Sequence, residues 1–190
     1  GKAEKCILCY PRLESGQPPA CFHSCVGRIR YIGLVLYDAD AIEQTAMAPQ
    51  ERLVMAQRDI IMDPFDPVVI AAAKASGVPD SKITAAQQAP GDQVGKKLGL
   101  ALPLHPEFRT LPMLFYVPPL GPVLAKVENG VYDNVAAEAR LGPLMSSLER
   151  SRIPLRYMAS LLSGGNEEII RDVYRKLVAV RVYMRSKKVK

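Results

Sequence analysis

Hydrophobic residues recur at helical spacing in three successive stretches between residues 49 and 88. A proline stands at the head of each stretch, namely Pro49, Pro67 and Pro79. Proline suits the first turn of a helix, where its missing N–H has no helical partner, and glycine commonly follows the last turn. The pattern therefore predicts three helices: one after Pro49, one over residues 68–75 that stops at Gly77, and one from Pro79 through residue 88.

The C-terminal part of the chain shows the same helical periodicity. Residues 154–162 form an apolar series before Gly164 and Gly165, and residues 141–148 allow one or two further helical turns. Asn166 then stands at the N-cap of a long amphipathic helix. Its apolar side is predicted to carry Ile169, Ile170, Val173, Leu177 and Val180, and its other side Arg171, Arg175, Lys176, Arg181 and Arg185. We interpret the basic side as solvated, with a protein contact as the alternative.

Two stretches have the composition of β-strands. Residues 29–37 predict a strand packed on one apolar face, and residues 113–117 a short buried strand within the proline-punctuated region 98–125. Asp38 and Asp40 are typical of a strand-to-helix turn with an N-cap rather than of a carboxylate pair. Strands beside predominant helices make the expected fold class α+β.

Composition sets outer limits on the function. The 190 residues are 48% hydrophobic and 23% charged, which is typical of a globular protein. The net charge of +6 is compatible with nucleic-acid binding, but the chain has no basic recognition helix and no aromatic-interleaved basic strand. We interpret the positive charge as complementary to an acidic partner or to an anionic cofactor. Six prolines interrupt the most apolar region, residues 98–124, so we expect no membrane-spanning segment.

All four cysteines lie in the first 25 residues, in the order Cys6, Cys9, Cys21 and Cys25. The C-x2-C-x11-C-x3-C spacing groups soft thiolates, which are typical metal ligands. The x2 and x3 spacings favour iron–sulfur clusters, because bacterial cluster motifs use both and their last cysteine ligates a different cluster. A zinc-stabilised binding module, two disulfides and four unrelated thiols are the alternatives.

The short sequence motifs around the cysteines, and several later ones, are distinctive. They are EKCILCYPR at 4–12, GQPPAC at 16–21, CVGRIRY at 25–31, LYDADAI at 36–42, AAQQ at 85–88, LALPLHPEFRTLPM at 100–113, YVPPL at 116–120, SRIP at 151–154 and YMA at 157–159. Together they resemble the iron–sulfur (beta) subunit of the respiratory nitrate reductase and nitrite oxidoreductase family. The same family includes the beta subunits of selenate, chlorate, perchlorate, dimethyl sulfide and ethylbenzene enzymes.

The resemblance implies unequal roles for the thiols. Cys6, Cys9 and Cys21 would bind one [4Fe–4S] cluster with a cysteine from an upstream ferredoxin-type motif, and Cys25 would complete a second [4Fe–4S] cluster. Residues 1–37 would then be the C-terminal part of a bacterial-ferredoxin-like domain, and residues 38–190 a mainly helical, proline-rich C-terminal region. The full subunit would also hold a third [4Fe–4S] and a [3Fe–4S] cluster. We expect the chain to be an interior fragment that cannot assemble its clusters alone.

The resemblance also implies a function. Such a subunit relays electrons between a molybdenum catalytic alpha subunit and a haem-containing or membrane-anchoring gamma subunit, in nitrate reduction or nitrite oxidation. It belongs to an oxidoreductase but carries no catalytic residue of its own. The complex would be associated with a membrane, on a face that the sequence does not determine. Beta subunits of the related oxyanion, sulfide and hydrocarbon enzymes are the alternatives within the family.

Other residues are assigned supporting roles. We expect Ile7, Leu8, Ala20, Phe22 and Val26 to form a dry shell around the thiols, and Lys2, Lys5, Arg12, Arg28 and Arg30 either to balance cluster charge or to be solvated. His23 is predicted to donate towards a cluster sulfur or to face solvent. His105 is predicted to be a structural histidine that hydrogen-bonds a loop, with acid–base chemistry beside Glu107 as the alternative.

Overall fold

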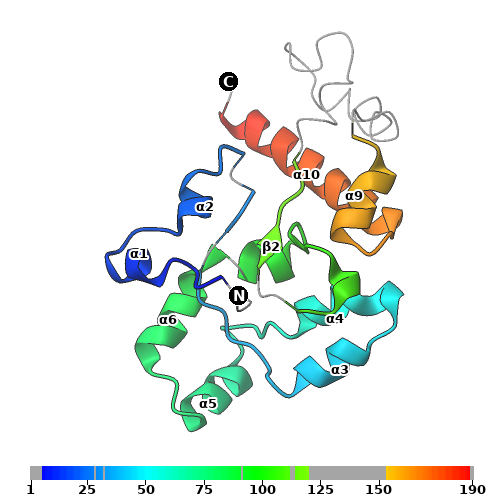
Figure 1. Cartoon of the computed structure of the whole chain (residues 1–190). Coiled ribbons are helices and arrows are strands. Elements are labelled where there is room, and N and C mark those ends of the chain that lie inside the picture. Colours follow the sequence, from blue (N-terminus) through cyan, green and yellow to red (C-terminus); the bar gives the residue numbers. More distant parts are fainter. Residues whose placement is uncertain are drawn as a thin grey trace, which may run out of the picture.

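The computed structural model describes residues 6–27, 29–31, 33–90, 92–111, 114–119 and 153–188. Helices make up most of this part, and its one sheet has two strands, so the expected α+β class is confirmed (Figure 1). The elements, in chain order, are α1 (Tyr10–Glu14), α2 (Ala20–His23), α3 (Ala41–Met47), η1 (Gln50–Arg52), α4 (Leu53–Asp59), α5 (Pro67–Ala75), α6 (Asp80–Gln88), η2 (Asp92–Lys97), β1 (Leu102–Pro103), η3 (Pro106–Phe108), β2 (Phe115–Tyr116), α9 (Leu155–Leu162) and α10 (Glu167–Lys188).

The three proline-headed helices of the middle region are confirmed. A short 3-10 turn, η1, leads from Pro49 into α4, and Pro79 directly precedes α6. Pro67 is the first residue of α5, and the side chain of Asp66 caps this helix by accepting a hydrogen bond of 2.8 Å from the Val68 N–H. Gly77 follows α5 with a φ of +79°, a value that glycine adopts without strain. The predicted turns at residues 141–148 lie outside the described residues.

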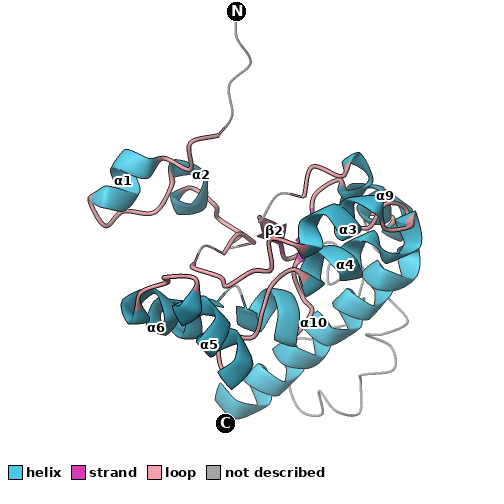
Figure 2. Cartoon of the chain, turned by 90° about the horizontal axis from the view of Figure 1, so that it is seen from below, coloured by secondary structure: helices cyan, strands magenta, loops and turns pink. Residues whose placement is uncertain are grey.

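The hydrophobic core lies where α9 and α10 pack against α4 and β1 (Figures 1 and 2). It contains Val54, Leu102, Leu155, Met158, Ala159, Leu162, Ile170, Val173 and Tyr174. The prediction for the apolar side of α10 was right for Ile170 and Val173 but wrong for Val180, which is exposed. It also missed Tyr174, only 1% exposed, whose pKa is raised to about 12 by burial. The buried stripe is set by contact with α9, and the helix extends beyond that contact.

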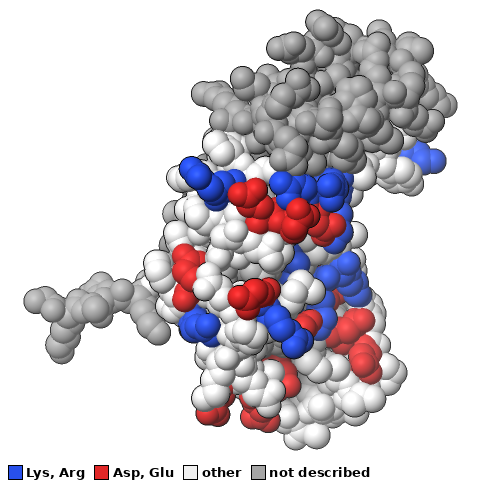
Figure 3. All heavy atoms as spheres, turned by 90° about the vertical axis from the view of Figure 1, so that its right-hand side faces the viewer, with Lys and Arg blue, Asp and Glu red and all other residues white. Residues whose placement is uncertain are grey.

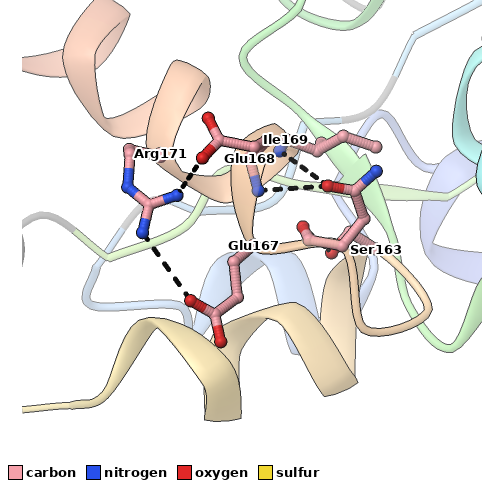
Figure 4. Close-up of polar contacts among 6 residues, drawn as sticks. Ser163, Glu167, Glu168, Ile169 and Arg171 are labelled. Carbon is pink, nitrogen blue, oxygen red and sulfur yellow. Dashed lines mark hydrogen bonds and ion pairs between the residues drawn. The ribbon is translucent and has the colours of Figure 1, made fainter.

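The N-terminus of α10 is capped as the sequence predicted. Oδ1 of Asn166 accepts hydrogen bonds from the backbone N–H groups of Glu168 at 3.0 Å and Ile169 at 3.4 Å (Figure 4). The Ser163 hydroxyl donates to the Asn166 carbonyl at 2.7 Å, which fixes the turn between α9 and α10. The cap therefore satisfies two N–H donors that the first helical turn cannot pair internally.

Replacing Asn166 with alanine is expected to lower the free energy of unfolding by about 1 kcal/mol, because both of these N–H groups lose their side-chain acceptor. Urea unfolding of the chain, followed by far-ultraviolet circular dichroism, measures the change. Asn166→Asp is the matched control, since aspartate keeps the acceptor and its charge suits a helix N-terminus. Equal losses in the two variants would contradict the capping role.

The basic side of α10 is paired within its own helix at several positions. Arg171 forms ion pairs with Glu167, at 3.7 Å, and with Glu168 (Figure 4), and Lys176 pairs with Asp172 at 2.8 Å. On the face shown in Figure 3, basic and acidic side chains are interspersed, with no large area of one sign. Arg175, Lys176 and Arg181 are exposed, which agrees with the interpretation of a solvated helix face, whereas the Arg171 side chain is only 15% exposed.

The predicted strand over residues 29–37 was wrong as a continuous element. In its described residues the segment makes two isolated antiparallel bridges, Arg30 with Tyr116 and Tyr37 with Ile61. Each end of the extended segment therefore pairs with a different short partner, and in the described part of the chain no neighbour runs along its whole length. The second prediction, a strand at 113–117, corresponds to β2, which is half-buried rather than buried; Met113 is not among the described residues. β2 pairs antiparallel with β1 in the register Leu102 opposite Tyr116.

The turn after this segment follows the sequence prediction in outline. Oδ1 of Asp38 accepts from the N–H groups of Asp40, at 3.0 Å, and Ala41, at 3.4 Å, and α3 begins at Ala41. The two aspartates thus form a helix-initiating turn, and the capping carboxylate is that of Asp38.

A buried arginine joins α4 to the loop before β1. Arg58, 7% exposed, donates through Nη2 to the carbonyls of Gly99 at 2.8 Å and Ala101 at 2.7 Å, and through Nε to Ala101 at 3.2 Å. Desolvation by burial lowers its pKa, while the carboxylates of Asp172 and Asp59 act in the opposite direction. The guanidinium remains protonated because its ordinary pKa is far above neutrality.

A π-helix, η2, lies directly before this loop, and the sequence did not predict it. Its last residue, Lys97, pairs with buried Asp92 at 3.1 Å and with Asp63 at 3.5 Å. The hydrogen bond to Asp92 raises the pKa of Lys97, and the Phe65 N–H lowers the pKa of Asp63. These contacts join η2 to the turn before α5.

None of the described helices combines the length and apolarity that crossing a membrane requires.

Candidate metal centre

The four cysteines lie on a thin segment at one edge of the molecule, residues 6–27, which we call the cysteine segment. In both views its helices, α1 and α2, lie apart from α9 (Figures 1 and 2). The described residues after position 32 are called the helical body. None of the cysteines forms a disulfide; Cys6 and Cys21 are exposed, and Cys9 and Cys25 are half-buried. The disulfide alternative is therefore not present in this structure.

The first pair of cysteines is held by a strained turn. Leu8 and Cys9 both have left-handed backbone conformations, with φ of +55° and +50°, which non-glycine residues seldom adopt. This conformation turns the Leu8 N–H to Sγ of Cys6, at 3.4 Å. The Cys9 carbonyl accepts from the N–H of Arg12, at 2.8 Å, as α1 begins. Backbone strain at this point is explained by a turn that directs an N–H donor to sulfur.

The second pair of cysteines is organised by α2. Cys21 lies in this short helix, and the Cys25 N–H donates to the Phe22 carbonyl at 3.2 Å just beyond its end. The x3 spacing thus corresponds to about one helical turn followed by a change of direction. The loop between the two pairs is fixed by Nε of Arg12, which donates to the Pro18 carbonyl at 2.8 Å. Arg12 therefore has a structural bond within the cysteine segment.

The thiols fit an iron–sulfur group by chemistry but do not form a complete site. Among the described residues, no group of three or more His, Cys, Asp or Glu side chains is arranged to hold one metal ion. Iron–sulfur clusters take thiolates, and their sulfurs accept N–H hydrogen bonds of the kind that Leu8 makes to Cys6. The donor set is therefore suitable for such a group. The grouping of Cys6, Cys9 and Cys21, with Cys25 apart, stays a prediction.

The predicted dry shell around the thiols is not formed by this segment. Val26 is 98% exposed and Ile7 64% exposed, Leu8 and Ala20 are also exposed, and Phe22 is half-buried. The segment is a single layer of chain, so side chains on its outer surface have no second layer to pack against. Of the predicted cations, Lys2, Lys5 and Arg28 lie outside the described residues.

Arg30 links the cysteine segment to the helical body. Its Nη1 donates to the carbonyl of Cys21 at 2.8 Å, and its Cζ lies 5.5 Å from the ring centroid of Tyr116. Its backbone also forms the antiparallel bridge with Tyr116. The sequence identified Arg30 only as one of several cations near the thiols. Arg30 and Tyr116 are far apart along the chain, so nothing in the sequence indicated that they are in contact.

A small apolar cavity of about 110 Å³ lies where the two parts meet. Leu8 and Phe22 line it from the cysteine segment, and Val35, Ile61 and Phe115 are among the lining residues of the body. Each of the two cysteine turns thus places one apolar side chain at this interface. The cavity shows that the apolar packing between segment and body is incomplete.

Neither histidine forms a catalytic arrangement in the described residues. His23 is exposed at the end of α2, which agrees with the solvent-facing alternative. The backbone N–H of His105 donates to the Leu161 carbonyl at 2.7 Å, which fixes the loop after β1 against α9. The His105 Nδ1 lies 2.7 Å from Oε1 of Glu107 and its ring stacks on Phe108, both within the same loop, so the structural interpretation of His105 is supported.

Comparisons with known proteins agree with these features. A family model described as "4Fe-4S dicluster domain" matches residues 1–35, and one described as "Respiratory nitrate reductase beta C-terminal" matches residues 120–190. The respiratory nitrate reductase 1 beta chain of Escherichia coli (strain K12) is 46% identical over 190 residues, which are 100% of this chain and 36% of that protein. The nitrate reductase beta chain of Bacillus subtilis (strain 168) is 43% identical over 186 residues, 97% of this chain and 37% of the relative.

A more distant relative is the dimethylsulfide dehydrogenase subunit beta of Rhodovulum sulfidophilum, 32% identical over 160 residues, 84% of this chain and 29% of that protein. The chain spans about a third of the length of the curated nitrate reductase relatives it matches. The resemblance seen around the cysteines thus extends along the whole sequence. The chain belongs to the family of the respiratory nitrate reductase beta chains.

Proposed function

We propose that this chain forms part of an iron–sulfur electron relay in a molybdenum oxidoreductase, in nitrate reduction or nitrite oxidation. The observation that carries the proposal is the set of four thiols on one segment, outside any disulfide, with an N–H donor turned to sulfur. The match of this segment to a dicluster-domain model supports it. Identity to nitrate reductase beta chains, at 46%, exceeds identity to the dimethylsulfide enzyme subunit, at 32%, and favours the nitrate-type substrates.

The proposed ligand roles follow the sequence interpretation. Cys6, Cys9 and Cys21 bind one [4Fe–4S] cluster and Cys25 a second, each completed by thiolates outside this chain. A third [4Fe–4S] and a [3Fe–4S] cluster belong to the complete subunit. Residues 1–37 are then the end of the ferredoxin-like domain, and residues 38–190 the helical C-terminal region.

When bound, the clusters supply one-electron transfer. The residues of this chain orient the thiolates and set their surroundings. The turn at Leu8 directs an N–H to Cys6, Arg12 fixes the loop between the two pairs, and α2 sets the spacing of Cys21 and Cys25. No side chain in the described residues is assigned a bond-making step.

The proposed partners follow from the subunit type. The chain docks a molybdenum-containing alpha subunit on one side of the relay and a haem-containing or membrane-anchoring gamma subunit on the other. The complex is associated with a membrane through the gamma subunit.

Metal analysis of the intact subunit, purified without oxygen, tests the proposal. We expect several atoms each of iron and acid-labile sulfide per polypeptide, in nearly equal amounts with sulfide slightly in excess because of the [3Fe–4S] cluster, together with EPR signals of reduced [4Fe–4S] centres. Zinc at one atom per four of these thiols, in colourless protein, would instead favour the zinc-stabilised binding module. Absence of both metals would contradict both functions.

A further inference from the structure

We infer that Arg30 is a positioning residue for the cluster bound by Cys21: it fixes the cysteine segment on the helical body and holds a cation beside the ligand turn. The inference rests on the proposed function, and it assigns a specific task to a residue that does not itself ligate iron.

The contacts of Arg30 form a continuous connection from a proposed ligand to the core. Its guanidinium binds the Cys21 carbonyl at 2.8 Å on one side and lies over the Tyr116 ring on the other. Tyr116 pairs with Leu102 in the sheet and packs against the buried core cluster. The neighbouring backbone adds a hydrogen bond from the Val117 N–H to the Ile29 carbonyl, at 2.9 Å. Figure 2 shows the chain after α2 running towards β2. The orientation of the Cys21 turn is thus tied to the sheet.

The apolar contact at the same interface is too open to fix this orientation by itself. The cavity beside Leu8 and Phe22 leaves those side chains without close neighbours on one side, so they lose part of their dispersion contact. A directional hydrogen bond from a planar guanidinium restricts orientation more strongly than a loosely packed apolar contact does. Arg30 therefore fixes the orientation of the cysteine segment on the helical body, which the apolar packing alone does not.

The guanidinium that binds the Cys21 carbonyl also has an unused donor. Nε of Arg30 is buried, and within the described residues it has no hydrogen-bond acceptor. A buried donor without an acceptor is energetically unfavourable. A thiolate or sulfide at the Cys21 turn is an acceptor of the kind that this N–H requires. Positive charge and N–H donors both favour the reduced, more negative state of a cluster, so Arg30 is expected to raise its midpoint potential.

Three variants of the intact subunit separate position from charge. Arg30→Met removes both, Arg30→Lys keeps the charge but loses the planar fork, and Arg109→Met is the matched control. Arg109 is also an arginine bonded to backbone carbonyls, those of Ala46 at 2.7 Å and Ala48 at 2.6 Å, but these partners lie within the helical body. EPR-monitored redox titration gives the midpoint potentials, and hydrogen exchange gives the amide protection of residues 6–27.

We expect Arg30→Met to lower the midpoint potential of the cluster bound by Cys21 and to increase amide exchange in the cysteine segment on the order of tenfold. Arg30→Lys is expected to recover the potential in part while exchange stays fast. Arg109→Met should change neither the potential nor the exchange of the cysteine segment. If Arg30→Met does not accumulate, the comparison of Arg30→Lys with Arg109→Met decides the question by the same two measurements.

Unchanged potential and exchange in a cluster-loaded Arg30→Met subunit would overturn the inference. Equal shifts in the Arg30 and Arg109 variants would do so as well, because they would reflect net charge alone. A wild-type subunit without iron would instead refute the proposed function. In that case hydrogen exchange still tests whether Arg30 anchors the segment, so the two failures are distinguishable.

Discussion

Replacing Cys21 with serine in the intact subunit is expected to remove one [4Fe–4S] cluster, about four iron atoms per polypeptide, and to leave the neighbouring cluster largely in place. The reason is the proposed division of labour, in which Cys21 serves one cluster with Cys6 and Cys9 while Cys25 serves another. Iron analysis and EPR of the reduced protein measure the loss. Because a serine oxygen can replace a thiolate as a weak ligand, Cys21→Ala is the stricter form of the same test.

The reciprocal variant, Cys25→Ser, provides the control. It should remove the other EPR signal and keep the one that Cys21→Ser abolishes. Survival of both signals in Cys21→Ser and Cys21→Ala would refute the ligand assignment. Loss of the same single signal in the Cys21 and Cys25 variants would show that the two thiols bind one and the same cluster.

Replacing Arg58 with methionine is expected to lower the free energy of unfolding by about 2–4 kcal/mol. Methionine keeps much of the aliphatic volume but removes every donor, so the carbonyls of Gly99 and Ala101 lose the hydrogen bonds of 2.8 and 2.7 Å that Arg58 makes to them. The loop before β1 would then lose its attachment to α4, next to the core. Urea unfolding monitored by circular dichroism measures the effect.

Arg52→Met is the matched control for this variant. Arg52 is an exposed arginine six positions before Arg58, at the end of η1. Its replacement should change the free energy of unfolding by less than about 0.5 kcal/mol, as is usual for exposed sites. Comparable losses at Arg52 and Arg58 would mean that general charge effects, and not the buried hydrogen bonds, account for the result.

Local signals in the sequence predicted much of the helical framework correctly. Proline at the start of α5, glycine after it, and Asn166 before α10 all act through residues within a few positions along the chain. The cysteine spacing and the surrounding sequence motifs likewise identified the family, because both consist of residues close together in the sequence. Such features depend on backbone geometry over a turn or two, which the amino-acid order largely decides.

Where the sequence prediction failed, distant parts of the chain had determined the outcome. Residues 29–37 are rich in strand formers, but at its two ends the segment bridges different partners, Tyr116 and Ile61. Val180 has the right spacing for the apolar side of α10 but is exposed, while Tyr174 and Val178 are buried. Periodicity states which residues could share a face, whereas burial requires a neighbouring element to cover that face.

By itself, the amino-acid order determined the helix starts and ends, the grouped thiols and the family, since each is written in adjacent residues. Only the tertiary structure decided that Arg58 bonds the loop before β1 and that Arg30 joins the Cys21 turn to Tyr116. Arg30 and Tyr116, for instance, lie 86 positions apart along the chain. Contacts of this kind exist only after the chain has folded, because folding supplies the proximity that spacing cannot encode.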